Sequence, residues 1–344
     1  MKLVFLSNYF NHHQQPLSEA LCRQPGISYC FIATMPLPPQ REKLGYHMEN
    51  LPEYVCPVWR SREDQSRGME LLTAADVVIA GSAPEELVRF CIRQNKLLLR
   101  YSERPLKKGL ELWRYPDRFL RWRWKNPSRK PIYMLCASGF AAKDYRKFGL
   151  FRGKTFQWGY FPETKRYPSI DTLILKKDPS VILWCGRFLE WKHPDDAIAV
   201  ARKLRDGGCQ FHMHFIGSGP MEAAMKRLIR EYRLGDCVTL LGAMPPDQVR
   251  THMEKAGIYL FTSDRQEGWG AVLNESMNSG CAVVAGNAIG SVPYLLEDGT
   301  NGLIYASGNV EMLCEKVQYL LENPEVQGRL GRAAYETIVS VWNA

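Results

Sequence analysis

Residues 261–286 read FTSDRQEGWGAVLNESMNSGCAVVAG, and this stretch predicts a strand, a loop, a helix and a second strand. The apolar residues 258–261 indicate a buried strand entering the unit, residues 281–285 indicate one leaving it, and Gly280 suits the end of the helix between them. Glu267 then lies on the loop at the strand's carboxyl end, where open α/β sheets bind ligands. Glu275 follows eight residues later. At about 100° per residue, both carboxylates are expected on one side of the unit.

The glycines beside Glu267 predict an anion site. The backbone N–H groups of Gly268, Trp269 and Gly270 are expected to face the same crevice, and a helix N-terminus favours anionic oxygen. One carboxylate can accept hydrogen bonds from sugar hydroxyls while these amides hold a phosphate. Two glutamates at this spacing also occur on ordinary surface helices, so the interpretation depends on a second stretch of the chain.

That second stretch is residues 181–196, VILWCGRFLEWKHPDD. The apolar run 181–185 predicts a strand, and Gly186, Arg187 and Lys192 follow it. Arginine offers a planar fork to phosphate oxygens and lysine a mobile point charge, so the pair suits a diphosphate. The alternative is a solvated basic loop.

Four motifs now stand in order along the chain: GRFLEWK, FIGSGPMEAAMKRLI, VTLLGAMPPDQV and the Glu-x7-Glu run. Together they resemble the nucleotide-sugar half of the retaining family-4 glycosyltransferases of GT-B fold, over roughly residues 180–305. The resemblance implies an α/β protein with two Rossmann-like domains facing each other across a cleft. It also implies a role for each matching residue: the donor diphosphate on Arg187 and Lys192, the donor sugar on Glu267, the ribose on Glu275, the base near the backbone of Met244, and a donor-site border at Gly186, Gly217 and Gly219.

The chain departs from the family pattern in three places. Residues 290–294 read GSVPY where the family often has a Gly-Gly pair and then Pro-Glu. The first predicted strand is followed by SNYFNHHQQPLSEAL, which contains no glycine for a phosphate loop and brings His12 and His13 to a strand end. The sequence stops at Ala344, where the family's last helix usually crosses back, so we expect that helix to be truncated.

Three residues of the first half are candidates for the acceptor side. His12 and His13 could contact the acceptor or the donor phosphate, or form a plain polar loop. Glu103 follows the predicted strand 96–101, at a strand end expected to face the cleft. Its alternative role is a salt bridge to Arg100 or Arg104.

Alternating strands and helices run through both halves and predict parallel sheets. We expect strands at 2–6, 28–33, 76–80, 96–101 and 132–136, and then at 181–185, 211–216, 238–241, 258–261 and 281–285. Helices are expected after Pro194, ending at Gly207, and from Pro220. The polar, proline-bearing residues 162–178 predict a linker. The expected domains are therefore an acceptor-side domain, 1–165, and a nucleotide-sugar-binding domain, 166–344.

Positive charge is concentrated in the first half. The whole chain has a net charge of +9, while residues 1–165 carry 27 Lys plus Arg against 15 Asp plus Glu. Residues 105–131 hold nine of these cations, interleaved with Trp113, Trp122 and Trp124. Basic residues with interfacial aromatics predict docking on an anionic membrane surface. The alternative is a solvated basic face with its tryptophans packed inward. No nucleic-acid partner is expected, because no recognised binding module accompanies the patch.

The resulting prediction is a retaining hexosyltransferase that uses a nucleotide-diphosphate sugar, with no further cofactor and no metal, since the chain lacks any Asp-x-Asp. The acceptor is expected to be a glycan or lipid-linked glycan of envelope polysaccharide assembly. A GT-B-shaped sugar-nucleotide epimerase and a non-catalytic sugar-nucleotide-binding protein remain as alternatives. Ten scattered cysteines, no long apolar run and a polar continuation after MKLVFLSNYF predict a cytoplasmic protein, peripheral on the inner face of the membrane if residues 105–131 dock there.

Overall fold

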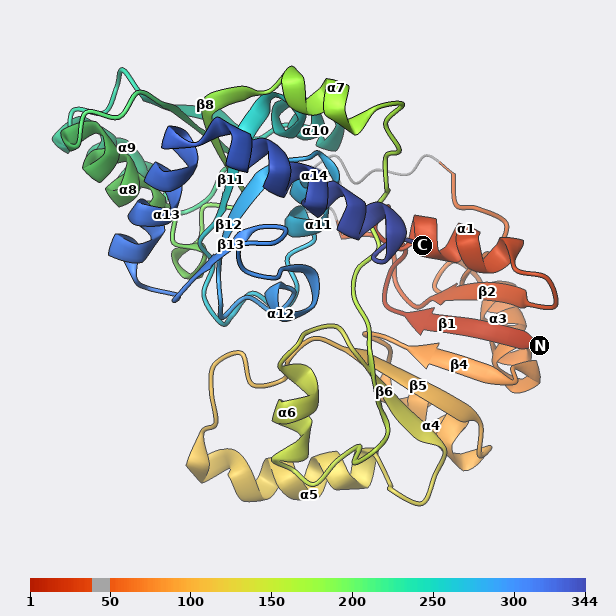
Figure 1. Cartoon of the computed structure of the whole chain (residues 1–344). Helices are drawn as coiled ribbons and strands as arrows, with labels where there is room; N and C mark the ends of the chain where they lie inside the picture. Colours follow the sequence, from red (N-terminus) through yellow and green to blue (C-terminus); the bar gives the residue numbers. More distant parts are fainter. Residues whose placement is uncertain (39–49) are drawn as a thin grey trace. The chain divides into compact units, whose positions relative to one another are not determined.

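The computed structural model describes residues 1–38 and 50–344, which divide into two compact units, Met1–Pro162 and Glu163–Asn343 (Figure 1). The boundary falls three residues before the one expected from the sequence. Each unit is a parallel sheet with helices, as the alternating pattern predicts.

The first unit contains a seven-stranded sheet in the order β3-β2-β1-β4-β5-β6-β7. All of its strand pairs are parallel, and in register Leu3 of β1 lies beside Tyr29 of β2 and Val77 of β4. Its strands are β1 (Lys2–Ser7), β2 (Ser28–Ala33), β3 (Val55–Pro57), β4 (Val77–Ala80), β5 (Leu97–Ser102), β6 (Ile132–Cys136) and β7 (Thr155–Gln157). Its helices are α1 (Gln15–Arg23), α3 (Arg62–Ala74), α4 (Glu85–Arg93), η1 (Leu112–Arg114), α5 (Tyr115–Lys125) and α6 (Ala141–Arg146).

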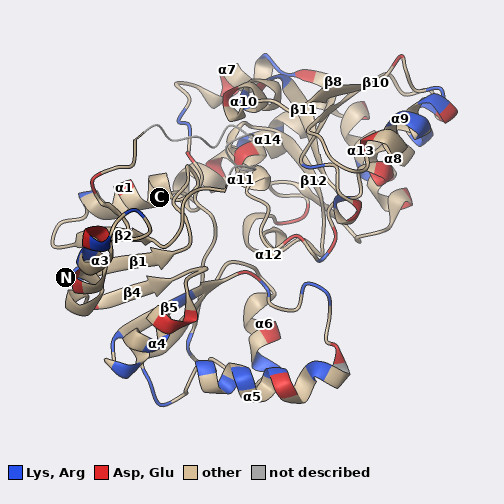
Figure 2. Cartoon of the chain, turned by 180° about the vertical axis from the view of Figure 1, so that it is seen from behind, with Lys and Arg blue, Asp and Glu red and all other residues tan. Residues whose placement is uncertain are grey.

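Both faces of this sheet are covered, because successive side chains of β1 enter different cores. Val4 and Leu6 belong to one buried cluster, and Leu3 and Phe5 belong to another. Several of the residues along α5 are Lys or Arg, as the blue segments of this helix in Figure 2 show. Within residues 1–38 and 50–344, every helix is too short or too polar to cross a lipid bilayer.

The second unit contains a six-stranded parallel sheet in the order β10-β9-β8-β11-β12-β13. Its strands are β8 (Asp178–Cys185), β9 (His212–Ile216), β10 (Val238–Gly242), β11 (Ala256–Phe261), β12 (Ala282–Gly286) and β13 (Leu303–Tyr305). Its helices are α7 (Ile170–Leu175), η2 (Glu190–Lys192), α8 (Pro194–Asp206), α9 (Glu222–Glu231), α10 (Pro246–Lys255), α11 (Val272–Asn278), α12 (Val292–Leu295), α13 (Val310–Glu322) and α14 (Pro324–Ser340).

All ten predicted strands are present, and α8 ends at Gly207 as expected. The predicted linker 162–178 is wrong in its central part, because residues 170–175 form α7, which packs against α14. Ser169 begins this helix by accepting a hydrogen bond from the Thr172 N–H, a cap that a search for apolar periodicity does not detect.

Candidate functional site

The candidate site lies where the strand order of the second sheet reverses. Strand β8 pairs with β9 on one side and with β11 on the other, so chain connections leave this point in opposite directions. In open parallel sheets, ligands bind outside the carboxyl ends of the strands at such a point. The loops that follow β8 and β11 carry Arg187, Lys192 and Glu267. These charged residues therefore lie at the carboxyl edge of the sheet, where the sequence predicts them.

Lys192 and Glu267 form a buried ion pair. Lys192 Nζ lies 2.5 Å from Glu267 Oε2, and both side chains are 11% exposed. Ser263 Oγ donates a second hydrogen bond to the same carboxylate oxygen, at 2.9 Å. The pair joins the β8 and β11 loops, which stand 75 residues apart in the chain. A carboxylate that is bonded in this way is held in one orientation and keeps its second oxygen for a ligand hydroxyl.

Two buried hydrogen bonds in series hold the backbone of Lys192 in place. Trp184 Nε1 donates to Thr262 Oγ1 at 2.8 Å, and Thr262 Oγ1 donates to the Lys192 carbonyl at 2.6 Å. His193 then takes a left-handed conformation, with φ of 48°, between η2 and α8. The sequence alone does not indicate a role for Thr262 and Ser263, because hydroxyl residues after an apolar run form no distinctive motif.

Arg187 differs from Lys192 in its exposure. Its side chain is exposed, and it follows Gly186 directly at the end of β8. The two cations predicted to act together are therefore an open guanidinium and a buried ammonium. Together they can stabilise negative charge on a diphosphate at this strand end, with the lysine preorganised by its carboxylate partner.

Gly217 and Gly219 allow the loop after β9 to lie against the loop after β8. A Cβ on Gly217 would fall 1.9 Å from the Gly186 carbonyl oxygen, and one on Gly219 would fall 2.5 Å from the Phe188 carbonyl oxygen. The Phe188 N–H donates to the Ser218 carbonyl at 2.9 Å across the same contact. The Gly217 N–H also donates to the Gly242 carbonyl at 2.8 Å, which brings the loop containing Met244 to this edge.

The segment Gly268–Gly270 has a structural role that the sequence did not reveal. The Trp269 side chain is fully buried, and its Nε1 donates to Asn274 Oδ1 at 2.9 Å, so only its backbone can serve the anion site. A Cβ on Gly270, whose φ is 86°, would fall 2.4 Å from the Phe261 ring. The Gly290 N–H donates to the Glu267 carbonyl at 3.1 Å, which ties the atypical loop 290–294 to the same site.

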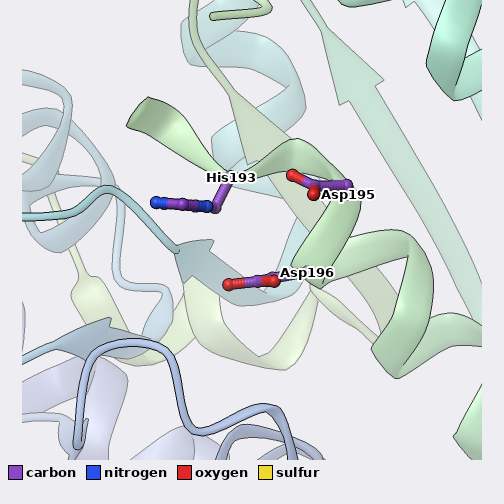
Figure 3. Close-up of side chains that lie close together, drawn as sticks. All are labelled: His193, Asp195 and Asp196. Atoms are coloured by element: carbon purple, nitrogen blue, oxygen red, sulfur yellow. The ribbon is translucent and has the colours of Figure 1, made fainter. Parts of the chain in front are cut away.

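His193, Asp195 and Asp196 form a second polar group beside Lys192. Each offers one ligand atom, and these atoms lie within 4.8 Å of one another (Figure 3). Both aspartates stand in the first turn of α8, where carboxylates stabilise the positive end of the helix dipole. Burial raises the pKa of Asp196, while His193 opposes this shift. We assign the two aspartates to the start of α8.

Glu275 lies on α11, which begins only at Val272. Because Glu267 precedes the helix, the 100° spacing argument does not apply to the pair, and the two carboxylates have different surroundings. Glu275 is partly buried, and burial raises its pKa, while the positive charge of Arg250 acts in the opposite direction. The charged form of the Glu275 carboxyl is therefore less favourable than the charged form of a solvated carboxyl.

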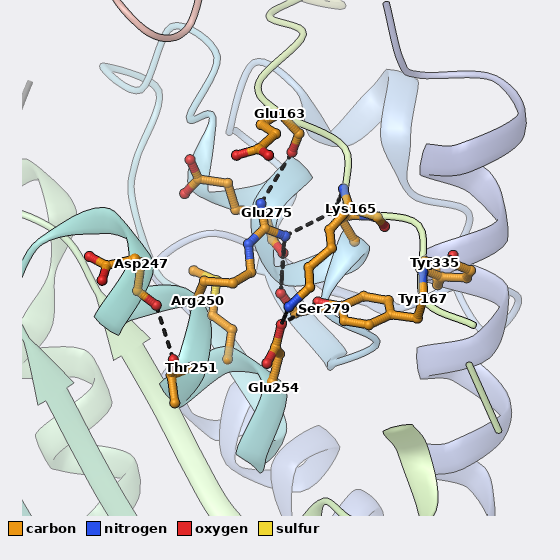
Figure 4. Close-up of polar contacts among 12 residues, drawn as sticks. Glu163, Lys165, Tyr167, Asp247, Arg250, Thr251, Glu254, Glu275, Ser279 and Tyr335 are labelled. Carbon is orange, nitrogen blue, oxygen red and sulfur yellow. Dashed lines mark hydrogen bonds and ion pairs between the residues drawn. The ribbon is translucent and has the colours of Figure 1, made fainter. Parts of the chain in front are cut away.

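Arg250, on α10, connects α11 to the first residues of the second unit (Figure 4). Its guanidinium donates to Asn278 Oδ1 at 2.9 Å, to Ser279 Oγ at 3.3 Å and to the Glu163 carbonyl at 3.1 Å. Asn278 in turn exchanges two hydrogen bonds with the Lys165 backbone, at 2.8 and 3.0 Å. The helix that carries Glu275 is therefore anchored at its carboxyl end.

Residues 163–171, which we call the strap, are bound to the second unit at further points. Lys165 Nζ and the Tyr167 hydroxyl both donate to Glu254 Oε1, at 2.6 and 2.7 Å. The Tyr167 N–H donates to the Tyr335 hydroxyl at 3.0 Å, and Arg332 pairs with Asp171. The polar composition that predicts a linker here serves these contacts.

In the first unit, the structure places the candidate acceptor residues at two strand ends. His12 and His13 lie in the turn before α1, with ring centroids 3.9 Å apart. Glu103 directly follows β5, accepts a hydrogen bond from the Tyr160 hydroxyl at 2.5 Å and pairs with Lys107. The alternative salt bridges of Glu103 are wrong, because Arg100 pairs with Glu85 and Arg104 with Asp144.

Comparison with known proteins identifies relatives of this chain. Residues 169–337 match the family model of Glycosyl transferases group 1. The chain is 32% identical over 140 residues to the amylovoran biosynthesis glycosyltransferase AmsK of Erwinia amylovora, a match covering 39% of this chain and 34% of that protein. It is 25% identical over 232 residues to the alpha-D-kanosaminyltransferase of Streptomyces kanamyceticus, covering 64% of this chain and 59% of that protein. The matches thus span about a third to three fifths of these relatives.

Solved structures resemble the whole chain. Anabaena HepE in complex with UDP has a TM-score of 0.71 at 15% identity, covering 100% of this chain and 96% of that one. WaaG, a glycosyltransferase involved in lipopolysaccharide biosynthesis, has a TM-score of 0.63 at 14% identity, covering 99% and 95%. The two parallel sheets with their helices are those of the GT-B fold, as the sequence predicted.

Proposed function

We propose that this protein is a retaining glycosyltransferase that moves a hexose from a nucleotide-diphosphate donor to a glycan or lipid-linked acceptor. The match of residues 169–337 to Glycosyl transferases group 1 supports an enzyme that transfers sugar. The name of the relative AmsK, which refers to amylovoran biosynthesis, supports a role in the assembly of an envelope polysaccharide.

One observation carries the proposal: the buried Lys192–Glu267 pair at the reversal point of the second sheet, with Arg187 at the same strand end. Arg187 and Lys192 bind the donor diphosphate, and Glu267 accepts hydrogen bonds from the donor sugar. Glu275 binds the ribose, while Gly186, Gly217 and Gly219 let the backbone approach the donor. The backbone near Met244 contacts the base.

Retention follows if the acceptor attacks from the side that the diphosphate leaves. The acceptor oxygen bonds to the anomeric carbon, the bond from that carbon to the diphosphate oxygen breaks, and the acceptor proton passes to the leaving diphosphate. The protein holds the diphosphate and stabilises the charge that develops on it, through Arg187 and Lys192. Metal is not required in this scheme, since these two side chains supply the positive charge.

The acceptor is assigned to the first unit, with His12, His13 and Glu103 as its candidate contacts. Glu103 is held by Tyr160 and Lys107, which suits a fixed acceptor of hydrogen bonds from a sugar. The proposed compartment is the cytoplasm, and the cysteines support it. All ten are free thiols, and burial raises the pKa of Cys185 to about 12, so this thiol stays protonated.

The proposal is tested first by melting the protein with a panel of nucleotide-diphosphate sugars. A donor at a hundred times its dissociation constant adds about 2.7 kcal/mol of stability, which a thermal shift detects. The donor found in this way is then incubated with lipid-linked and free glycans, and the anomeric coupling constant of the product is measured by NMR.

We expect release of nucleotide diphosphate only when acceptor is present, and a product with the donor's anomeric configuration. Release without acceptor, together with a changed donor sugar, would favour the epimerase. Donor binding without turnover across the panel would favour a non-catalytic binding protein. An inverted product would contradict the retaining mechanism while leaving the donor site in place.

A further inference from the structure

Helix α5 presents apolar side chains to solvent on one of its faces. Leu120 is 69% exposed and Trp124 is 61% exposed, and their spacing of four residues sets them one turn apart on the same side. Trp113 lies in the short 3-10 turn η1 that precedes α5 and is 77% exposed. Isolated apolar residues at a surface need no explanation, but three large exposed ones on one helix and the turn before it indicate an interaction site.

The opposite side of α5 already has a partner within the first unit. The Trp122 ring centroid lies 4.5 Å from that of Phe148 and 5.7 Å from that of Tyr145. Tyr115 stacks on Phe148 at 5.2 Å, and its hydroxyl donates to the Lys147 carbonyl. The three tryptophans of residues 105–131 therefore divide, with Trp122 packed inward and Trp113 and Trp124 turned outward. The outward pair does not serve the core of the unit.

Cations border the exposed row. Arg121 and Arg123 are both exposed on α5, and Arg89 of α4 lies over the Trp124 ring at 3.4 Å. Residues 105–131 contain nine Lys or Arg and two Asp or Glu. One of these acids, Asp117, pairs with Arg121 at 2.8 Å, but both side chains are largely exposed, so the pair competes weakly with other partners. The α5 outer face, defined as Trp113, Leu120, Trp124, Arg121 and Arg123, is thus apolar in its centre and basic along its sides.

We propose that the α5 outer face docks the first unit on an anionic lipid bilayer. Tryptophan rings settle at the level of the lipid headgroups, and leucine enters the boundary of the acyl chains. Arginine side chains beside them reach lipid phosphates, and each adds favourable energy at an anionic surface. A protein partner would match the apolar row, and a nucleic acid would match the cations. A bilayer with anionic headgroups matches both the apolar centre of this face and the cations along its sides. This inference stands apart from the proposed transfer reaction.

The test measures co-sedimentation of the whole protein with vesicles of phosphatidylcholine, alone or mixed with phosphatidylglycerol. We expect binding to the mixed vesicles and little to phosphatidylcholine alone. Arg121→Gln with Arg123→Gln should weaken the binding about 25-fold, since each nearby cation contributes roughly fivefold. Binding should also fall as salt rises, because the attraction is screened over about 8 Å at physiological ionic strength.

The apolar row is tested with the triple variant Trp113→Ser, Leu120→Ser and Trp124→Ser. We expect its binding to be lost at every salt concentration, since the remaining cations have no apolar anchor. The matched control is Trp59→Ser with Arg60→Gln, another exposed tryptophan with an arginine 5.7 Å from its ring, located after β3 at the other edge of the first sheet. The control should bind vesicles like the unchanged protein, and melting curves should show that all variants fold.

Three outcomes would overturn the inference. Equal vesicle binding by the unchanged protein and the triple variant would remove the α5 outer face from membrane contact. Loss of binding in the Trp59 control as well would point to general charge attraction. A change in oligomeric mass of the triple variant without lipid, with vesicle binding unaltered, would assign the face to a second copy of this chain.

Discussion

Replacement of Lys192 by methionine is expected to destabilise the second unit as well as the donor site. The substitution keeps most of the side-chain volume but leaves the Glu267 carboxylate without its buried cation. Breaking such a pair from one side typically costs about 3–5 kcal/mol, because an uncompensated charge remains buried. The lower end applies here, since both side chains are 11% exposed and Ser263 still donates to the carboxylate.

This cost converts into a measurable shift in melting temperature. For a unit of this size, each kcal/mol lowers the melting temperature by roughly 2–4 °C, so we expect a fall of roughly 6–12 °C for Lys192→Met. The melting temperature of Glu267→Gln should fall as well, because this variant leaves the Lys192 ammonium without its carboxylate partner. The double variant should recover a large part of the loss, which calorimetry of the four proteins measures as a coupling energy.

The exposed pair Lys226–Glu222 supplies the matched control. Lys226 Nζ lies 2.7 Å from Glu222 Oε1, a distance similar to that in the buried pair, but the two side chains are 54% and 39% exposed. Lys226→Met should therefore shift the melting temperature very little, since exposed pairs contribute about 0.2–1 kcal/mol. If Lys192→Met melts within a degree of the unchanged protein, or the double variant melts at the sum of the two single losses, the reasoning from burial is wrong.

Four further outcomes are expected. Arg187→Ala should lower kcat/KM about a hundredfold or more with little change in melting temperature, because its side chain is exposed; unaltered turnover would remove the diphosphate assignment. Glu275→Gln should weaken nucleotide binding about tenfold without loss of stability at neutral pH. Because the pKa of Glu275 is raised in the folded state, its contribution to the free energy of unfolding is present below the ordinary pKa of 4.5 and is lost as pH rises through the folded pKa. Glu275→Gln removes this titration, so an unchanged dependence of stability on pH in that variant would contradict the reasoning. Arg250→Gln should lower the melting temperature of the second unit, and Arg250→Lys should restore little of it, because an ammonium cannot serve the same spread of acceptors. Addition of EDTA should leave the transfer rate unaltered, and a rate that depends on added Mg²⁺ would place a cation in the donor site.

Ten strands of the two sheets could be predicted because each has four residues or more and most of its residues are apolar. The strands that were missed, β3, β7 and β13, have three residues each, too few for a run to stand out. Helix α7 was missed for another reason. Its six residues lie in a polar stretch with prolines, and its packing on α14, not its own sequence pattern, accounts for it.

The candidate site could be predicted as a set of residue types but not as a set of contacts. The motifs indicate that Lys192 and Glu267 each lie on a loop after a strand, yet their ion pair depends on the side-by-side placement of β8 and β11. Ser263, Thr262 and Arg250 hold the site residues from outside the motifs. Their contribution follows from distances in space, which a single sequence does not contain.

The strap also limits where this chain can be recombined with its relatives. Lys165, Tyr167 and Asp171 find their partners within the second unit, although the stretch looks like free connecting chain in the sequence. A chimaera joined in the middle of residues 162–178 would therefore separate these side chains from Glu254, Tyr335 and Arg332. Exchange of the first unit, whether in evolution or in the laboratory, should be tolerated best at a junction just before Glu163.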